Sequence, residues 1–183
     1  GLYLSCKSCG QVKGSGLFGL KLEKKNNTNV KLADIIIDLG SLACGHTKLG
    51  SLLSEKDSFA QHFNKLECLY DITSGIEIGV KSHILDYVFI TIANSNAKFV
   101  KSGDSLSINS KTTIPEIIAI FGEPYWEDED ESEIILFYEY NEGAFEMQFE
   151  FSDKLHLGFI TIMQNGVLST SEQRELCGIT KPW

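Results

Sequence analysis

Large apolar and polar side chains alternate without a break over one stretch of the chain, Phe145-Glu146-Met147-Gln148-Phe149-Glu150-Phe151. An alternation of period two is typical of a β-strand, because successive side chains point to opposite faces of a sheet. We therefore expect the four apolar side chains to face the helices, and Glu146, Gln148 and Glu150 to face solvent. Glu139 is the polar member of the preceding strand and is expected beside them. The stretch predicts a sheet with an acidic outer face.

Similar patterns predict further strands, with turn residues between them. Ile35, Ile37 and Leu39 indicate a strand that ends at Gly40. The other runs rich in Ile, Val, Phe and Tyr predict strands at residues 67–72, 75–81, 84–93, 106–108, 134–140, 144–152 and 155–163. Residues 94–103 are expected to be a polar linker, and the acidic run 127–131 a solvated hairpin loop.

Helix signals are strongest between Thr112 and Pro124. Thr112 or Thr113 is a capping residue, Pro115 stands in the first turn, and Gly122 ends the apolar face. That face consists of Ile114, Ile117, Ile118 and Phe121. In the first half of the chain, Leu49, Leu52 and Leu53 have the spacing of one helix face and predict a short helix that opens at Thr47. Residues 59–63 and 171–176 are expected to be short helical pieces.

The order of elements recurs along the chain, and part of the sequence recurs with it. Phe89-Ile90-Thr91-Ile92 reappears as Phe159-Ile160-Thr161-Ile162, an offset of 159 − 89 = 70 residues. The runs that begin at Leu49 and Ile114 align with an offset of 114 − 49 = 65. We therefore predict an α+β fold of two related units, each a short helix packed on an antiparallel sheet. The predicted domains are a flexible arm at residues 1–30, repeats at 31–98 and 99–168, and a tail at 169–183.

The charge balance restricts the class of partner. Sixteen basic residues face 25 acidic ones, which gives a formal net charge of −9. Such a chain repels phosphate backbones, so we expect no nucleic-acid binding, whereas it suits solubility and a basic protein partner. No window approaches the ~20 apolar residues of a transmembrane helix. The odd cysteine count favours the cytoplasm. A first residue other than Met leaves open a bacterial cell envelope after signal cleavage.

Motifs for catalysis or metal binding are weak. Cys6-Lys7-Ser8-Cys9-Gly10 is half of a zinc-ribbon site, and the sequence holds no second CxxC, although Cys44 and His46 would complete a set of four ligands. An idle or disulfide-forming pair is the simpler interpretation. The four histidines share no ligand spacing, and no nucleophile or phosphate-loop motif occurs. The acidic run lacks the Gly-centred spacing of a calcium loop. We therefore expect no metal, no cofactor and no enzymatic activity.

One motif resembles a known group of bacterial proteins. The segment Thr113-Ile114-Pro115-Glu116-Ile117-Ile118-Ala119-Ile120-Phe121-Gly122-Glu123-Pro124 resembles the T-x-x-E-hydrophobic-x-x-hydrophobic-G-x-P helix of the SmpA/OmlA and β-lactamase-inhibitor-protein group. In that group aromatic-rich antiparallel strands follow the helix. The tandem arrangement is similar to the inhibitor branch, whose members carry two copies and present a concave sheet face to a partner protein. The first copy here lacks the Gly-x-Pro ending.

These observations together predict a binding surface. It consists of aromatic residues beside the acidic run, acidic residues of the run, and the acidic sheet face, namely Tyr125, Trp126, Asp128, Glu129, Asp130, Glu139, Glu146 and Glu150. An aromatic side chain next to charge is typical of a binding hot spot. We expect an inhibitor or toxin-immunity protein that blocks a basic enzyme. The alternative is a structural or envelope-assembly protein of the SmpA/OmlA type.

Overall fold

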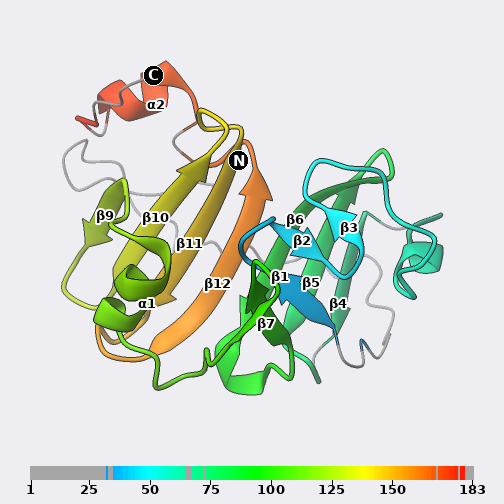
Figure 1. Cartoon of the computed structure of the whole chain (residues 1–183). Helices are drawn as coiled ribbons and strands as arrows, with labels where there is room; N and C mark the ends of the chain where they lie inside the picture. Colours follow the sequence, from blue (N-terminus) through cyan, green and yellow to red (C-terminus); the bar gives the residue numbers. More distant parts are fainter. Residues whose placement is uncertain are drawn as a thin grey trace.

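A computed structural model of the protein describes Leu32 and residues 35–64, 67–71, 73–167, 169–176 and 178–179. Within them the chain is mainly β and forms two sheets (Figure 1). The smaller sheet has five strands, in the order β3 (Thr47–Lys48), β2 (Ala43–Cys44), β1 (Ile36–Asp38), β7 (Lys98–Lys101) and β8 (Asp104–Leu106). The larger has seven, in the order β4 (Cys68–Asp71), β5 (Ile76–Lys81), β6 (Ile84–Thr91), β12 (Leu157–Gln164), β11 (Phe145–Phe151), β10 (Ile134–Tyr140) and β9 (Trp126–Glu129). The helical elements of these residues are η1 (Ala60–Asn64), η2 (Ile92–Asn94), α1 (Ile114–Phe121) and α2 (Ser171–Leu176).

The predicted fold class, two units that each pack a helix on an antiparallel sheet, is wrong. The structure is mainly β, and α1 is the single α-helix of more than two turns in the described ranges. Thr47 and Lys48 form β3 instead of opening a helix, and residues 49–53 after them are not helical either. They then run beside the start of β6, where the Leu53 amide donates to the His83 carbonyl (2.9 Å) and the Leu85 amide to the Ser51 carbonyl (3.0 Å).

Backbone geometry explains why this segment is not helical. Gly45 and Gly50 have φ angles of 60° and 77°, which lie in the left-handed region that glycine adopts without strain and that a right-handed helix excludes. The spacing of Leu49, Leu52 and Leu53 therefore does not mark a helix face. Leu49 is buried, whereas Leu52 is 70% exposed.

The helix predicted from Thr113 to Gly122 is confirmed. It begins after Thr113, whose amide donates to the Glu116 carboxylate (2.7 Å), and Pro115 lies in its first turn. Gly122 follows with a φ of 82°. Ile117 on its apolar face is completely buried. This capping arrangement satisfies an amide at the helix start that has no intrahelical partner.

The two predicted repeats contribute strands to both sheets. In the larger sheet β6 pairs antiparallel with β12, and Ile90 lies directly opposite Ile160, so that the two Phe-Ile-Thr-Ile stretches pair with each other. In the smaller sheet β1 pairs parallel with β7, with Ile37 opposite Phe99. The predicted linker at residues 94–103 thus contains β7. The predicted arm at residues 1–30, with Cys6 and Cys9, lies outside the described residues.

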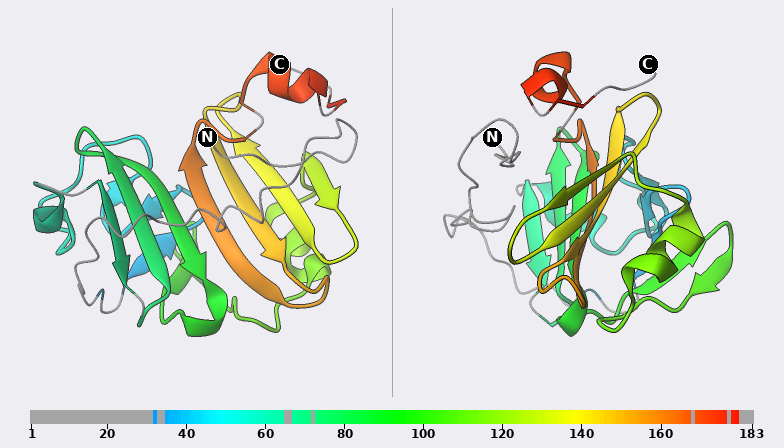
Figure 2. Two further views of the ribbon diagram at one scale, coloured as in Figure 1. Left: turned by 180° about the vertical axis from the view of Figure 1, so that it is seen from behind. Right: turned by 90° about the vertical axis from the view of Figure 1, so that its left-hand side faces the viewer.

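The core lies between the larger sheet and the elements on one of its faces. The smaller sheet and α1 both lie on this face, as two views show (Figures 1 and 2). We call it the inner face and the opposite one the outer face. Buried side chains of the inner face form one cluster with Ile37, Phe99 and Ile117 of the covering elements. They include Leu69, Ile76, Ile78, Val88, Ile90, Leu136, Met147, Phe149, Phe151, Ile160 and Ile162.

Candidate protein-binding surface

The outer face of the larger sheet carries large aromatic side chains in addition to carboxylates. Phe89 of β6 stacks on Phe159 of β12, with ring centroids 5.3 Å apart. Trp126 lies over Phe137, with centroids 4.7 Å apart. Phe137 is completely buried and Phe89 almost so, which shows that this face is covered rather than solvated. Burial of apolar side chains on both of its faces therefore stabilises the larger sheet.

Glu146 lies on this covered face, near the start of β11. The predicted alternation of β11 is confirmed, because Phe145, Met147, Phe149 and Phe151 belong to the inner core. The prediction that Glu146 faces solvent is wrong, since its exposed fraction is 0%. The turn after β12 packs directly against it, so that a Cβ added at Gly166 would lie 2.5 Å from the Glu146 Cβ. The covering segment is distant in sequence, which is why the period-two argument did not reveal it.

The Glu146 carboxylate accepts three hydrogen bonds. Its donors are the Gln148 amide group (2.6 Å), the Tyr125 hydroxyl (3.1 Å) and the Val167 backbone amide (3.2 Å). Such donors favour the charged carboxylate, but burial disfavours it more strongly and raises the pKa of Glu146. The same burial, and then the charges of Glu146 and Glu139, raise the pKa of the Tyr125 hydroxyl.

Glu139 lies directly opposite Glu146 on β10 and adds a second carboxylate to this cluster. The charge of Glu139 adds to burial in raising the pKa of Glu146. Glu139 and Glu150 are both half-buried, and Gln148 is buried. Glu139 and Glu146 are therefore brought together around Tyr125 as a packed polar cluster and not as an open acidic face, whereas Glu150 lies further along β11, opposite Ile135 and Phe159.

The acidic run itself forms β9 and the turn that follows, in place of the predicted solvated loop. Trp126 and Asp128 lie opposite Phe137 and Ile135 and share the covered face, and Asp128 is only 4% exposed. Asp130 shapes the turn, because its carboxylate accepts from the Ser132 amide (2.7 Å) and the Glu133 amide (3.0 Å). Three of the predicted site residues thus serve the structure of this edge.

The exposed carboxylates of this region lie on the other side of β9. Glu127 and Glu129 pair with Leu136 and Ile134, both of which pack with the inner core, and both glutamates are exposed at the sheet edge. Glu123 before the strand and Glu131 after it are exposed as well. We call Glu123, Glu127, Glu129 and Glu131 the β9 acidic edge. Lys154 supplies a basic group here, 2.8 Å from Glu129.

Sequence reasoning missed Glu127 as a site residue. The signal was present, because the strand alternation that was applied to residues 145–151 also applies to Trp126-Glu127-Asp128-Glu129. It assigns Trp126 and Asp128 to one face, and Glu127 and Glu129 to the other. Treating the acidic run as a loop concealed this division.

Neither the polar cluster around Asp57 nor the Cys68 thiol has the arrangement of a nucleophilic catalytic site. Asp57 is buried and accepts from the His46 amide (2.8 Å), the His46 ring (3.0 Å) and the Thr47 hydroxyl (2.6 Å). The carboxylate thus stands between the hydroxyl and the imidazole, whereas a nucleophilic triad needs the imidazole in the middle. Burial raises the pKa of the Cys68 thiol to about 11, which opposes formation of a thiolate nucleophile.

No protein-family model, curated protein or solved structure matches this chain. Among the described residues, no group of three or more His, Cys, Asp or Glu side chains is placed to hold a metal ion. In the same part of the chain, no helix has both the length and the apolar character to cross a membrane.

Proposed function

We propose that the chain is a non-enzymatic protein-binding module of the inhibitor or immunity type, which binds a basic protein through the β9 acidic edge. The observation that carries the proposal is the exposure of Glu123, Glu127, Glu129 and Glu131 along one edge of a seven-stranded sheet. A partner enzyme blocked in this way would present Lys and Arg side chains around its own site.

The charge density of this edge supports a basic partner. Seven of the eleven residues from Glu123 to Glu133 are acidic and none is basic. Charge of one sign concentrated on a surface accelerates encounter with a partner of opposite sign, and it disfavours acidic competitors. Compared with the sequence-based prediction, the contact surface moves from the outer sheet face to its edge, because Glu146 and Asp128 are buried.

The rigidity of the support is the second argument. β9 pairs with β10 over four positions, and the Trp126 ring lies on Phe137 beneath it. A surface that is ordered before binding loses little conformational entropy when the partner docks. Trp126 is half-buried and lies on the opposite side of β9 from Glu127 and Glu129, so we assign it to holding the edge in place.

The test uses two double charge reversals that change net charge equally. Glu127→Lys with Glu131→Lys alters the β9 acidic edge, and Glu172→Lys with Glu175→Lys alters exposed positions on α2. The parent chain captures its partner from the source organism, and association and dissociation rates are then measured for all three proteins at low and high salt.

We expect a partner with positive net charge and an association rate that falls at least tenfold for the β9 variant at low salt. The α2 variant should change the rate much less, and high salt should reduce the difference. An acidic partner, or equal effects of the two variants, would contradict the proposal.

A further inference from the structure

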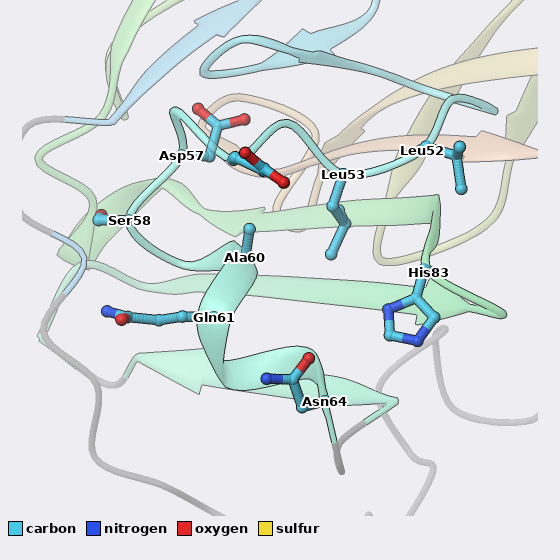
Figure 3. Close-up of a pocket in the computed structure, with 9 residues that line it drawn as sticks. Leu52, Leu53, Asp57, Ser58, Ala60, Gln61, Asn64 and His83 are labelled. Atoms are coloured by element: carbon cyan, nitrogen blue, oxygen red, sulfur yellow. The ribbon is translucent and has the colours of Figure 1, made fainter.

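A hollow of about 490 Å³ lies at the other end of the larger sheet from β9. One wall is the segment with Leu52 and Leu53, another is η1 with Gln61 and Asn64, and His83 in the β5–β6 turn closes one side (Figure 3). Its volume falls in the range of small-ligand sites. Neither the β9 acidic edge nor the Glu146 cluster contributes to it.

The walls of the hollow are held in place from several sides. Backbone hydrogen bonds join Leu53 to His83 and Ser51 to Leu85. The Asp57 carboxylate ties the loop before η1 to His46 and Thr47, and the Thr47 hydroxyl in turn accepts from the Ser54 amide (2.9 Å). Phe59 and Phe63 anchor η1 in the core. The hollow is therefore formed before any ligand arrives.

The lining combines apolar surface with negative charge. Leu52 is 70% exposed, which is unusual for a leucine held by backbone pairing, and the neighbouring Leu53 also faces the hollow. The formal charges of the lining are the carboxylates of Glu55 and Asp57, of which Asp57 is engaged by His46 and Thr47 and Glu55 is exposed. The side-chain amides of Gln61 and Asn64 each add an acceptor oxygen and an N–H donor group.

We propose that this hollow binds an organic cation on a short aliphatic stem, that is, an alkylguanidinium or alkylammonium group. Leu52 and Leu53 contact the stem, and Glu55 receives the charged head. The apolar surface favours a stem that leaves water, and the carboxylate discriminates against neutral or anionic heads. The proposal is independent of the partner at the β9 acidic edge.

The test is a titration followed by NMR on ¹⁵N-labelled protein with four probes. Butylguanidinium carries both features, N-butylurea is its neutral counterpart, and methylguanidinium lacks the stem. A capped Gly-Arg-Gly peptide presents the same chemistry within a polypeptide. We expect saturable shifts at residues 51–61 and 82–84, with a Kd for butylguanidinium on the order of 1 mM, as a ligand of this size allows. N-Butylurea and methylguanidinium should bind at least threefold more weakly.

Three variants link the binding to its residues. Glu55→Gln should weaken butylguanidinium about threefold and Leu52→Ser by a similar factor, and both positions are exposed enough to leave the fold intact. Glu175→Gln on α2 is the control and should bind like the parent. Tighter binding of the peptide than of butylguanidinium would assign the cation to a polypeptide, and the reverse to a free small molecule.

The proposal is overturned by any of three results. The first is that neither butylguanidinium nor the peptide produces saturable shifts around the hollow. The second is that N-butylurea binds as tightly as butylguanidinium, which would make the charge irrelevant. The third is that Glu175→Gln weakens binding as much as Glu55→Gln, which would show a general attraction to an acidic surface.

Discussion

Replacing Glu146 by Gln should stabilise the protein at neutral pH, although it changes a residue with three hydrogen-bond donors. In the native state Glu146 is fully buried opposite Glu139, and burial raises its pKa above the usual 4.5. A carboxyl group whose pKa is higher in the folded state than in the unfolded state stabilises the fold fully when the pH is below the unfolded-state pKa. This stabilisation is lost as the pH rises through the folded-state pKa. The amide that the Glu146→Gln substitution introduces would be neutral at every pH.

The size of the effect follows from the linkage between protons and folding. Above pH 4.5 each pH unit up to the folded pKa removes ~1.4 kcal/mol from the parent's free energy of unfolding. Near pH 4 the two proteins should differ little, because both side chains are neutral. The Glu146→Gln protein should then gain on the parent by ~1.4 kcal/mol for each unit of pKa shift. Its oxygen can still accept from Gln148 and Val167, which now donate to Glu146.

Urea unfolding at fixed pH values from 4 to 8 measures this difference. Glu142→Gln, at an exposed turn position, is the matched control and should follow the parent at every pH. A Glu146→Gln protein that is less stable than the parent at pH 7, with a deficit that grows with pH, would refute the reasoning. It would show that the three donors hold Glu146 charged in the fold.

Three further substitutions or modifications test the packing. Gly79→Ala should lower the free energy of unfolding by ~2 kcal/mol, because the new Cβ would overlap the Tyr87 ring. In a Tyr87→Ala background the cost should shrink, and an unchanged cost would contradict the clash. Gly45→Ala should lower the midpoint of thermal unfolding more than Gly103→Ala does. Both glycines have a positive φ, but only at Gly45 would an added Cβ meet the Asp57 carboxylate. Equal losses would leave backbone strain as the single cause. Iodoacetamide at pH 8 should label Cys44 and Cys68 much more slowly in the native than in the unfolded protein, because burial raises the pKa of both thiols. Peptide mapping measures the two rates. Rapid labelling of Cys44 in the native protein would show that this site opens.

The sequence predicted those parts of the fold that depend on local pattern. The structure contains the three longest strands of the second half close to where the runs of apolar residues predicted them. It also contains the helix that was predicted from the capping residue Thr113, Pro115 in the first turn and the terminating Gly122. The first-half helix failed because three leucines at helical spacing also occur in a chain that turns at Gly45 and Gly50. Spacing alone does not distinguish the two, whereas Gly50 inside the run and Gly45 just before it argue against a helix.

The two-sided burial of the larger sheet had a signal that was not used. Residues 134–138 read Ile-Ile-Leu-Phe-Tyr, so apolar side chains occupy both faces of that strand. Continuous apolar runs are typical of strands covered on both sides, whereas alternating runs are typical of half-solvated ones. β11 alternates and lies beside β10, so its polar positions face the same covered side. The burial of the neighbouring strand β10, and not the alternation of β11 itself, therefore determines whether Glu146 is exposed to water.

The same logic accounts for the acidic edge. Period two divides Trp126-Glu127-Asp128-Glu129 between a covered face and an exposed one, so neighbouring carboxylates in one run have different physical roles. Asp128 is buried on the same face as Trp126 and Phe137, and a change there would affect the stability of this edge. Glu127 is exposed, and a change there would affect binding of a partner. A run of like charges would repel itself if all its members shared one side. Turning alternate carboxylates to opposite faces separates them across the strand, and pairing with β10 then fixes the exposed members in a row that a partner can meet.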